Sequence, residues 1–336
     1  MALDPPLGWL PVDAVVVDGR PGLWWMDMSG VSLTEPFFQQ TVERAKVKDH
    51  RRELFTEFDV LLQLEKRLDS VPPTGFIFHS SRCGSTLLAN ACRAIASSIV
   101  LSEANAIDKL IARFITDAED DSVKESLYSV FLRGTMHALS QRRIGNEQHL
   151  FVKFAACSFA QFQRIKRIWP RVPSIFLYRD PIETIVSNLA GLPPWLIDND
   201  RRILASIIGV APAVVAEMRL EELCARTIGS LYSLAQRVAN DNCLLLNYNQ
   251  LSLPVISSAL NFFNVNLSAE EMKTIEHVTG IYSKEIAATR RFVADADVKQ
   301  QDASAGVREM AEKWASEPYH RLEQKRLEQA LPEPCF

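Results

Sequence analysis

The 336-residue sequence predicts an α/β fold, with three α/β/α layers around a central parallel sheet of about five strands. Three observations predict it: short apolar segments alternate with amphipathic helical segments, turn-forming residues separate them, and one strand leads through a loop of small residues into a helix. Such alternation is typical of a parallel sheet that is covered on both faces. We expect residues 1–70 to form an extension packed on a main domain, 71–336, which has a helical insertion near 191–240.

The first elements precede the sheet. Two β-favouring runs separated by Asp-Gly and Pro-Gly predict an irregular or hairpin-like opening up to about residue 33. A helix is expected to begin near Glu35 or Pro36, and the leucine spacing predicts a second helix from Glu53 to Leu68. The VPPT sequence at 71–74 then breaks the chain just before the central sheet.

Five apolar segments are expected to build the sheet. They are residues 76–79, 98–101, 149–157, 174–181 and 243–251. A helix is expected to begin at residue 85, after the first of these strands, and helical spacing follows the second strand up to about residue 138. Further helices are expected over 159–168 and 183–189, after the fifth strand up to residue 263, and over 268–278. Ligands of such sheets sit outside the carboxyl ends of the strands, so we expect polar side chains from four strand ends to meet there: Ser80–Thr86, Glu103, Lys153 and Arg179.

The stretch at 75–88, GFIFHSSRCGSTLL, predicts an anion-binding loop between a strand and a helix. Backbone N–H groups and a helix N-terminus in this arrangement typically bind a phosphate. The common nucleotide loop, G-x-x-x-x-G-K-[ST], requires Gly at 79 and Lys at 85, where this chain has His79 and Ser85. Its cation is instead Arg82, which favours a different phosphate-like group; a plain connecting loop is the alternative. The other expected contacts of this loop are Ser81, Cys83, Gly84, Ser85 and Thr86.

A second motif, YRDPIETIVS, places Arg179 at a strand end and Ser187 nearly two turns into the following helix. Both side chains can face the sheet edge. The alternatives are an ion pair of Arg179 with Asp180 or Glu183, and a mid-helix hydrogen bond of Ser187 to a preceding carbonyl. We interpret Asp180 as the N-cap of this helix, because Pro181 follows at a favourable first helical position.

Together, these motifs resemble the sulfotransferase family over roughly residues 75–265. SSRCGSTLL is similar to the family's 5'-phosphosulfate loop in its bacterial, arginine-containing form, and FLYRDPIETIVS is similar to its 3'-phosphate motif. LLLNYNQL at 244–251 resembles the family's late strand, which ends in an aromatic residue, a polar pair and Leu. The resemblance implies a nucleotide-kinase-like fold and 3'-phosphoadenosine-5'-phosphosulfate (PAPS) as the sulfuryl donor, with no metal expected.

The resemblance also implies residue roles. Arg82 and the loop amides hold the 5'-phosphosulfate, Arg179 and Ser187 bind the 3'-phosphate, and Lys153 stabilises charge on the leaving group. Many cytosolic members carry a catalytic His two residues after this Lys, where the chain has Ala155. Other members use a Glu after the second strand, so Glu103 is the expected base. The glycine-rich 3'-phosphate segment of the family has no clear counterpart; the basic residues that could replace it are Arg290, Arg291, Lys299 and Arg308.

Three other functions are considered. A magnesium-dependent kinase or NTPase would place Thr86 and Asp180 on the metal, but it lacks the loop lysine. A Cys83 nucleophile of the phosphatase type requires an Arg at position 89, which is Ala. An inactive nucleotide-binding scaffold does not explain why four charged residues gather at one predicted edge.

Composition restricts the partners. The net charge of −4 argues against broad nucleic-acid binding, which requires a basic face. There is no apolar stretch of membrane-spanning length, no signal-peptide pattern and no CxxC pair among six cysteines, so we expect a cytoplasmic protein without a membrane span. The acceptor is expected to be a small-molecule or glycan hydroxyl, and residues 191–212, including Trp195 and Leu196, are candidates for shaping its pocket.

Overall fold

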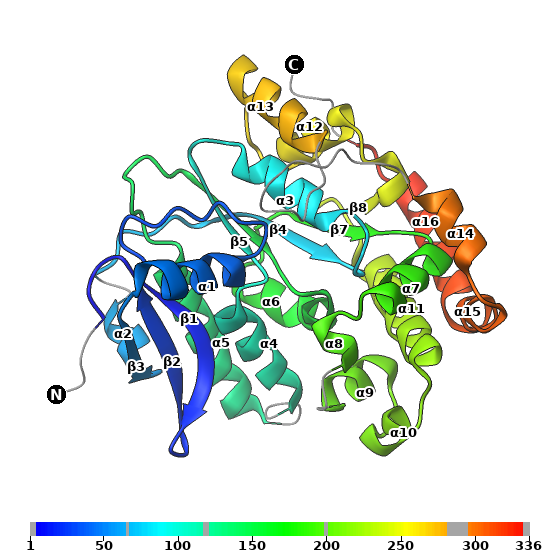
Figure 1. The fold of residues 1–336 in the computed structure, drawn as a ribbon, viewed down its shortest axis with the longest axis horizontal. Helices are drawn as coiled ribbons and strands as arrows, with labels where there is room; N and C mark the ends of the chain where they lie inside the picture. The colour runs from blue at the N-terminus through cyan, green and yellow to red at the C-terminus, as the bar shows by residue number, and fades with distance from the viewer. Residues whose placement is uncertain (1–4, 65–66, 117–120, 198–200, 281–294, 332–336) are drawn as a thin grey trace.

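The fold was determined as a computed structural model. It describes residues 5–64, 67–116, 121–197, 201–280 and 295–331 (Figure 1). Two sheets are present in this part of the chain. A small antiparallel sheet joins β1 (Trp9–Val17), β2 (Arg20–Asp27) and β3 (Glu53–Glu57). The central sheet is parallel throughout, in the order β5 (Ser98–Ser102), β6 (His149–Lys153), β4 (Pro73–His79), β7 (Ser174–Tyr178) and β8 (Cys243–Asn247).

The helices follow the strands in the predicted alternation. Before and within the first half of the sheet lie α1 (Phe38–Asp49), α2 (Val60–Leu64), α3 (Ser85–Arg93), α4 (Asn105–Thr116), α5 (Ser122–Leu139), the 3₁₀ turn Ala156–Gln161 and α6 (Phe162–Ile168). After β7 come α7 (Pro181–Ala190), α8 (Pro194–Ile197), α9 (Arg202–Ile208), α10 (Pro212–Ala216) and α11 (Leu220–Val238). After β8 come the 3₁₀ turn Tyr248–Gln250, α12 (Leu253–Phe262), α13 (Ala269–Thr279), α14 (Ala296–Asp302), α15 (Ala305–Ala311), the π-helical segment Glu312–Ser316 and α16 (Glu317–Leu327).

Two hydrophobic cores confirm the three-layer class. Along β4, Phe76 and Phe78 point to one core and Ile77 to the other, as the two-residue period of a strand requires. α3 and α12 pack on the Ile77 side, while α4 and α11 contribute to the opposite core (Figure 1). Both faces of the sheet are therefore buried, which explains why its strands read as continuous apolar runs rather than as alternating ones.

The predicted second helix, from Glu53 to Leu68, is wrong in its first half. Residues Glu53–Glu57 form β3, which pairs with β2, and only Val60–Leu64 are helical. In β3 the exposed Glu53 and Glu57 flank the buried Thr56, whose hydroxyl accepts a hydrogen bond from the Trp25 indole at 2.8 Å. Pairing with a distant hairpin therefore overrides the local helical spacing of the leucines.

The N-terminal sheet shares the larger core with the main domain. Trp9, Leu23 and Trp25 are buried in the same cluster as Phe76, and β1 lies against α4. The division at residue 70 and the boundary of the insertion stay predictions. Among the described residues, none of the helices has the length and apolar character to cross a bilayer.

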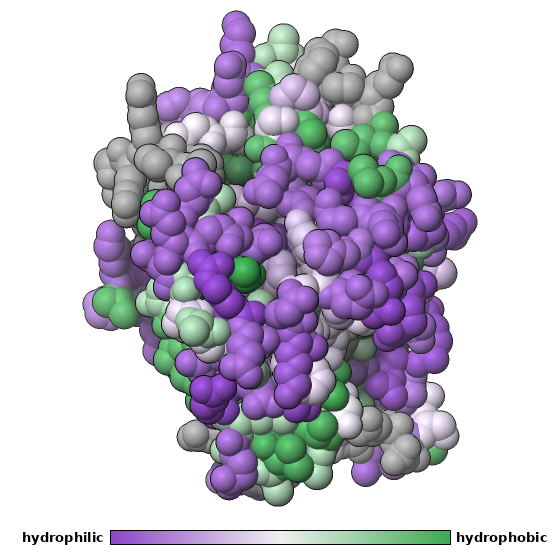
Figure 2. Space-filling model, turned by 90° about the vertical axis from the view of Figure 1, so that its right-hand side faces the viewer, coloured by the Kyte–Doolittle hydropathy of each residue, from purple (hydrophilic) through white to green (hydrophobic). Residues whose placement is uncertain are grey.

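The C-terminal helices return to the sheet. α14 and α15 pack on α7, and α16 packs on α11 and β8. Figure 2 shows this side of the molecule, where hydrophilic residues predominate and apolar ones are scattered in small groups. This return brings residues near 300 to the carboxyl end of β7, where the site is built.

Candidate anion-binding and catalytic site

The loop after β4, which the sequence predicts to bind an anion, has an unusual backbone conformation. Ser81, Arg82 and Gly84 have φ angles of 77°, 50° and 83°, so the chain turns through the left-handed region three times within four residues. Of the described non-glycine residues with positive φ, half lie in this loop or at Glu103. Such strain concentrates at functional sites.

Gly84 is required by both its backbone and its neighbours. A Cβ at this position would lie 2.4 Å from Leu251 Cδ1 and 3.0 Å from the Tyr248 ring. Gly84 is also the N-cap of α3 and supplies no side-chain cap, which leaves the first N–H groups of the helix for a ligand. The hydroxyls of Ser85 and Thr86 line the cavity in front of the loop.

This cavity measures about 520 Å³ and gathers several predicted residues. Ser81–Thr86 and Glu103 line one part of it. Trp195 and the segment 192–194 line another, together with Phe37 from the N-terminal extension. Trp195 lines this cavity, whereas Leu196 is fully buried in the core, and the expectation that residues 191–212 shape an acceptor pocket stays a prediction.

Two loop residues are held by the α7 region. The Ser81 hydroxyl donates to Asn188 Oδ1 at 2.8 Å, and the Arg82 guanidinium donates to the carbonyl of Gly191. Cys83 is buried, and burial raises the pKa of its thiol, so it stays protonated at neutral pH. A protonated, buried thiol agrees with the prediction that Cys83 is not a nucleophile.

Lys153 and Glu103 form an ion pair at the ends of β6 and β5. Lys153 is only 1% exposed, and its Nζ contacts Glu103 Oε1. The Nε2 of His79 lies 3.5 Å from the same oxygen. Burial alone would raise the pKa of Glu103, but the charge of Lys153 and the contact with His79 hold it well below its usual range. Glu103 is therefore ionised and strongly bound by its partners.

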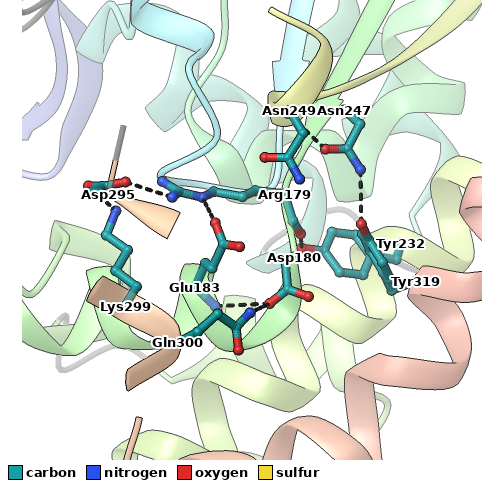
Figure 3. Close-up of polar contacts among 10 residues, drawn as sticks. All are labelled: Arg179, Asp180, Glu183, Tyr232, Asn247, Asn249, Asp295, Lys299, Gln300 and Tyr319. Atoms are coloured by element: carbon teal, nitrogen blue, oxygen red, sulfur yellow. Dashed lines mark hydrogen bonds and ion pairs between the residues drawn. The ribbon is translucent and has the colours of Figure 1, made fainter. Parts of the chain in front are cut away.

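The second motif forms a separate charged cluster, shown in Figure 3. Arg179 is 2% exposed; its Nε lies 2.5 Å from Glu183 Oε2 and its Nη2 2.7 Å from Asp295 Oδ1. The other oxygen of Asp295 lies 2.6 Å from Lys299 Nζ. Burial alone would lower the pKa of Arg179, but the hydrogen bonds with the two carboxylates raise it. The alternative of an ion pair between Arg179 and Glu183 is thus present in the ligand-free chain.

The other residues of this motif are placed as follows. Asp180 is the N-cap of α7, as expected: its Oδ1 accepts from the Glu183 N–H at 3.1 Å, with Pro181 in the first turn. The same oxygen accepts from Gln300 Nε2 at 3.0 Å. Ser187 is half-buried, one helical turn beyond Glu183 on the same flank of α7, and it makes no hydrogen bond to another described side chain.

Tyr248 lies next to both the loop after β4 and the Arg179 cluster. Arg179 lies over its ring at 4.0 Å, and the same ring bounds the space around Gly84. The loop after β4 and the Arg179 cluster therefore both lie next to the same aromatic side chain.

Sequence reasoning missed part of this site. Lys299 was one of four basic candidates, and the structure brings it to Arg179, whereas the Arg308 guanidinium contacts the carbonyl of Gln300. Arg290 and Arg291 lie outside the described residues. Asp295 and Asp108 were not expected; Asp108 also lines the cavity. The one available signal was the position of Asp108 in the first helical turn after Glu103.

No protein-family model matches the chain, and no curated protein matches it. Several solved structures are similar to it, including the following three. The sulfotransferase domain from the curacin biosynthetic pathway is 15% identical and covers 79% of this chain and 100% of its own, with a TM-score of 0.36. Mouse sulfotransferase SULT7A1 complexed with PAP is 14% identical, over 81% of this chain and 90% of its own, with a TM-score of 0.36. Retinol dehydratase in complex with retinol and PAP is 14% identical, over 84% and 89%, with a TM-score of 0.36.

Two of these three neighbours are sulfotransferases by name, the family that the motifs resemble. At such low identities and TM-scores, the superpositions say nothing about single residues. The roles of individual side chains therefore depend on the geometry of this chain alone.

Proposed function

We propose that the protein is a sulfotransferase that moves a sulfuryl group from PAPS to a hydroxyl of an acceptor. The observation that carries this proposal is that two groups of residues suited to bind anions, the loop after β4 and the Arg179 cluster, both lie next to Tyr248. PAPS carries a 5'-phosphosulfate and a 3'-phosphate on one adenosine, so it needs two such sites on a single surface. ATP carries no 3'-phosphate and makes no use of the second cluster.

The residues present fit this donor. The loop supplies uncapped N–H groups of α3, the Ser85 and Thr86 hydroxyls, and a backbone cradle at Gly84 that a side chain would fill. Arg179 and Lys299 already hold the carboxylate of Asp295 between them, so this position accepts an anion. Ser187, one turn beyond Glu183, is our proposed hydroxyl contact to the 3'-phosphate.

The chemistry depends on charge stabilisation. As the bond from sulfur to the bridging oxygen breaks, negative charge develops on the 5'-phosphate, where Arg82 and Lys153 supply positive charge. Lys153 is held by Glu103 before the donor binds. The Glu103 carboxylate therefore fixes the position of Lys153, and it is the candidate base that the family resemblance implies.

The kinase alternative is less well supported by the geometry. A magnesium ion between Thr86 and Asp180 requires a free Asp180 carboxylate, but one of its oxygens already accepts from the Glu183 N–H and from Gln300. The N-cap role explains this residue without a metal ion.

A binding experiment separates these possibilities. Adenosine 3',5'-bisphosphate (PAP) at 100 times its Kd should stabilise the protein by about 2.7 kcal/mol in the absence of magnesium, measured as a rise in Tm. ATP with magnesium should produce a smaller rise. The opposite order would support the kinase, while PAP binding without transfer from labelled PAPS to any hydroxyl would support the inactive scaffold.

A further inference from the structure

The cavity in front of the phosphate loop contains a carboxylate that the resemblance does not use. Asp108 lies in the first turn of α4, five residues after Glu103, and lines the cavity together with the loop. It comes from a different helix than any residue of the two expected motifs. Its place beside the loop makes it a candidate for direct contact with an acceptor.

The two oxygens of Asp108 are in different environments. Oδ1 accepts two hydrogen bonds, from the Ala155 N–H at 3.0 Å and from the Ser158 hydroxyl at 2.8 Å. Within the described residues, no hydrogen bond is formed by Oδ2. One oxygen thus fixes the carboxylate, and the other keeps the capacity to accept a proton.

The hydrogen bond from the Ala155 N–H places Asp108 next to the end of β6. Ala155 is the residue two positions after Lys153, where many cytosolic sulfotransferases carry a catalytic His. In this chain the side chain is a methyl group, and the backbone N–H of the same residue holds the Asp108 carboxylate. Ala155 and Asp108 both line the cavity in front of the loop.

The other two candidate bases are already engaged. Glu103 is bound by Lys153, which lowers its affinity for a proton. His79 accepts a hydrogen bond from the Ser81 N–H at Nδ1, at 3.0 Å, and its Nε2 faces Glu103. Both contacts of Glu103 involve Oε1, and the ion pair with Lys153 favours the ionised form of the whole carboxylate, whereas Asp108 has no ion pair among the described residues.

We propose that Asp108 is the general base that takes the proton from the acceptor hydroxyl, with Glu103 acting to position Lys153. This inference rests on the proposed sulfotransferase function. As the acceptor oxygen forms its bond to sulfur, the bond from sulfur to the bridging oxygen breaks and its electron pair stays on the 5'-phosphate. The hydroxyl proton passes to Asp108 Oδ2, so the products are the sulfate ester and PAP, and Asp108 later returns the proton to water.

The electrostatic surroundings agree with this role. Burial raises the pKa of Asp108 to about 7, although its hydrogen bonds with Ala155 and Ser158 act in the opposite direction. Of the nearby charges, Glu103 raises this pKa and Lys153 lowers it. The other titratable groups that line the cavity are His79, Arg82, Cys83 and Cys157. A base with a pKa near the working pH combines the deprotonated form with useful proton affinity.

The test uses Asp108→Asn in the full chain, since asparagine can keep both hydrogen bonds through its carbonyl. Transfer from labelled PAPS is measured with two probes, 2-naphthalenemethanol, whose hydroxyl needs a base, and 4-nitrophenol, which ionises unaided near neutral pH. We expect the rate with the alcohol to fall about 10²–10⁴-fold and the rate with the phenol to fall much less. PAP binding, measured as the rise in Tm, should remain unchanged.

Two further variants serve as comparisons. Asp241→Asn removes an exposed carboxylate before β8, at the opposite edge of the sheet, and should leave both rates unchanged. Glu103→Gln should slow transfer to both probes alike, because its effect is exerted through Lys153 and the leaving group. The wild-type rate with the alcohol should also rise with pH through about 7, and Asp108→Asn should lose this rise. This wild-type profile decides the question if the variant does not fold.

The outcomes are distinguishable. Full activity of Asp108→Asn with the alcohol, or a wild-type rate that does not change with pH near neutrality, overturns the assignment of Asp108 alone. A selective loss of the alcohol reaction in Glu103→Gln transfers the base role to Glu103. If PAP does not raise the Tm and the wild-type chain transfers sulfuryl to neither probe, the proposed function fails and the assignment fails with it.

Discussion

Replacing Asp295 by asparagine tests the donor site directly. In the ligand-free chain its two oxygens lie 2.7 Å from Arg179 Nη2 and 2.6 Å from Lys299 Nζ (Figure 3). We infer that the 3'-phosphate of the ligand binds the same two cations and has to displace this carboxylate. Asp295→Asn should therefore weaken the ligand-free fold while it strengthens the binding of PAP.

The expected magnitude follows from exposure. The Asp295 side chain is 45% exposed, so solvent screens both ion pairs, and each contributes about 0.5–1 kcal/mol. The variant should lose about 1–2 kcal/mol of unfolding free energy. The same energy no longer opposes ligand binding, so the Kd for PAP should fall about 5–30-fold. AMP lacks the 3'-phosphate and leaves the carboxylate in place, so its Kd should stay nearly constant.

Calorimetric titration with PAP and with AMP measures both constants, and urea unfolding measures the stability. Asp297→Asn is the matched control, since it removes an exposed carboxylate from the same helix, α14. Equal gains in affinity for PAP and AMP would show that Asp295 acts through general electrostatics. A weaker affinity for PAP in the variant would refute the idea that Asp295 occupies the 3'-phosphate position.

Two further predictions concern the loop and acid stability. Gly84→Ala should lower the free energy of unfolding by about 1–3 kcal/mol and abolish the PAP-induced rise in Tm, because the new Cβ meets Leu251. Gly19 also has a positive φ but has open space around it, so Gly19→Ala should keep the PAP-induced rise in Tm. Glu35, whose carboxylate contacts Arg44, has a pKa of about 2, because these contacts outweigh the burial that would raise it. The ionised Glu35 should therefore contribute about 3 kcal/mol to the free energy of unfolding above pH 4.5, and this contribution should be lost as the pH falls towards 2. Glu35→Gln should destabilise the protein at pH 7 but not at pH 2, as measured by urea unfolding at the two pH values.

The sheet could be predicted because its signals are local. Each strand is a short apolar run, and each turn that follows is made of small or polar residues, so β4, β5, β6, β7 and β8 all coincide with predicted segments. The strand ends were also predictable, because parallel topology forces them to one edge. β3 was not, because its partner is the hairpin about thirty residues earlier and its leucine spacing favours a helix.

The site was predictable where one segment supplies both the turn and the side chain. Ser81–Thr86 and Glu103 meet in one cavity, as expected from their strand ends. The place of Asp108 in the site was not predictable, because it depends on a hydrogen bond from the N–H of Ala155, which follows another strand. A carboxylate in the first turn of a helix is common, and only its neighbours distinguish it from an ordinary one.

The Arg179 cluster shows why a motif alone does not define a binding state. The motif supplies the cation and also Glu183, four residues later, which pairs with it across one helical turn. Asp295 and Lys299 arrive from a helix more than a hundred residues away and add one more carboxylate and one more cation. Arg179 is buried and would be costly to leave unpaired, and Glu183 and Asp295 supply the anions that pair with it. Glu183 is buried, whereas the Asp295 side chain is 45% exposed. We therefore expect an incoming phosphate to displace the carboxylate of Asp295 into solvent and to leave that of Glu183 in place.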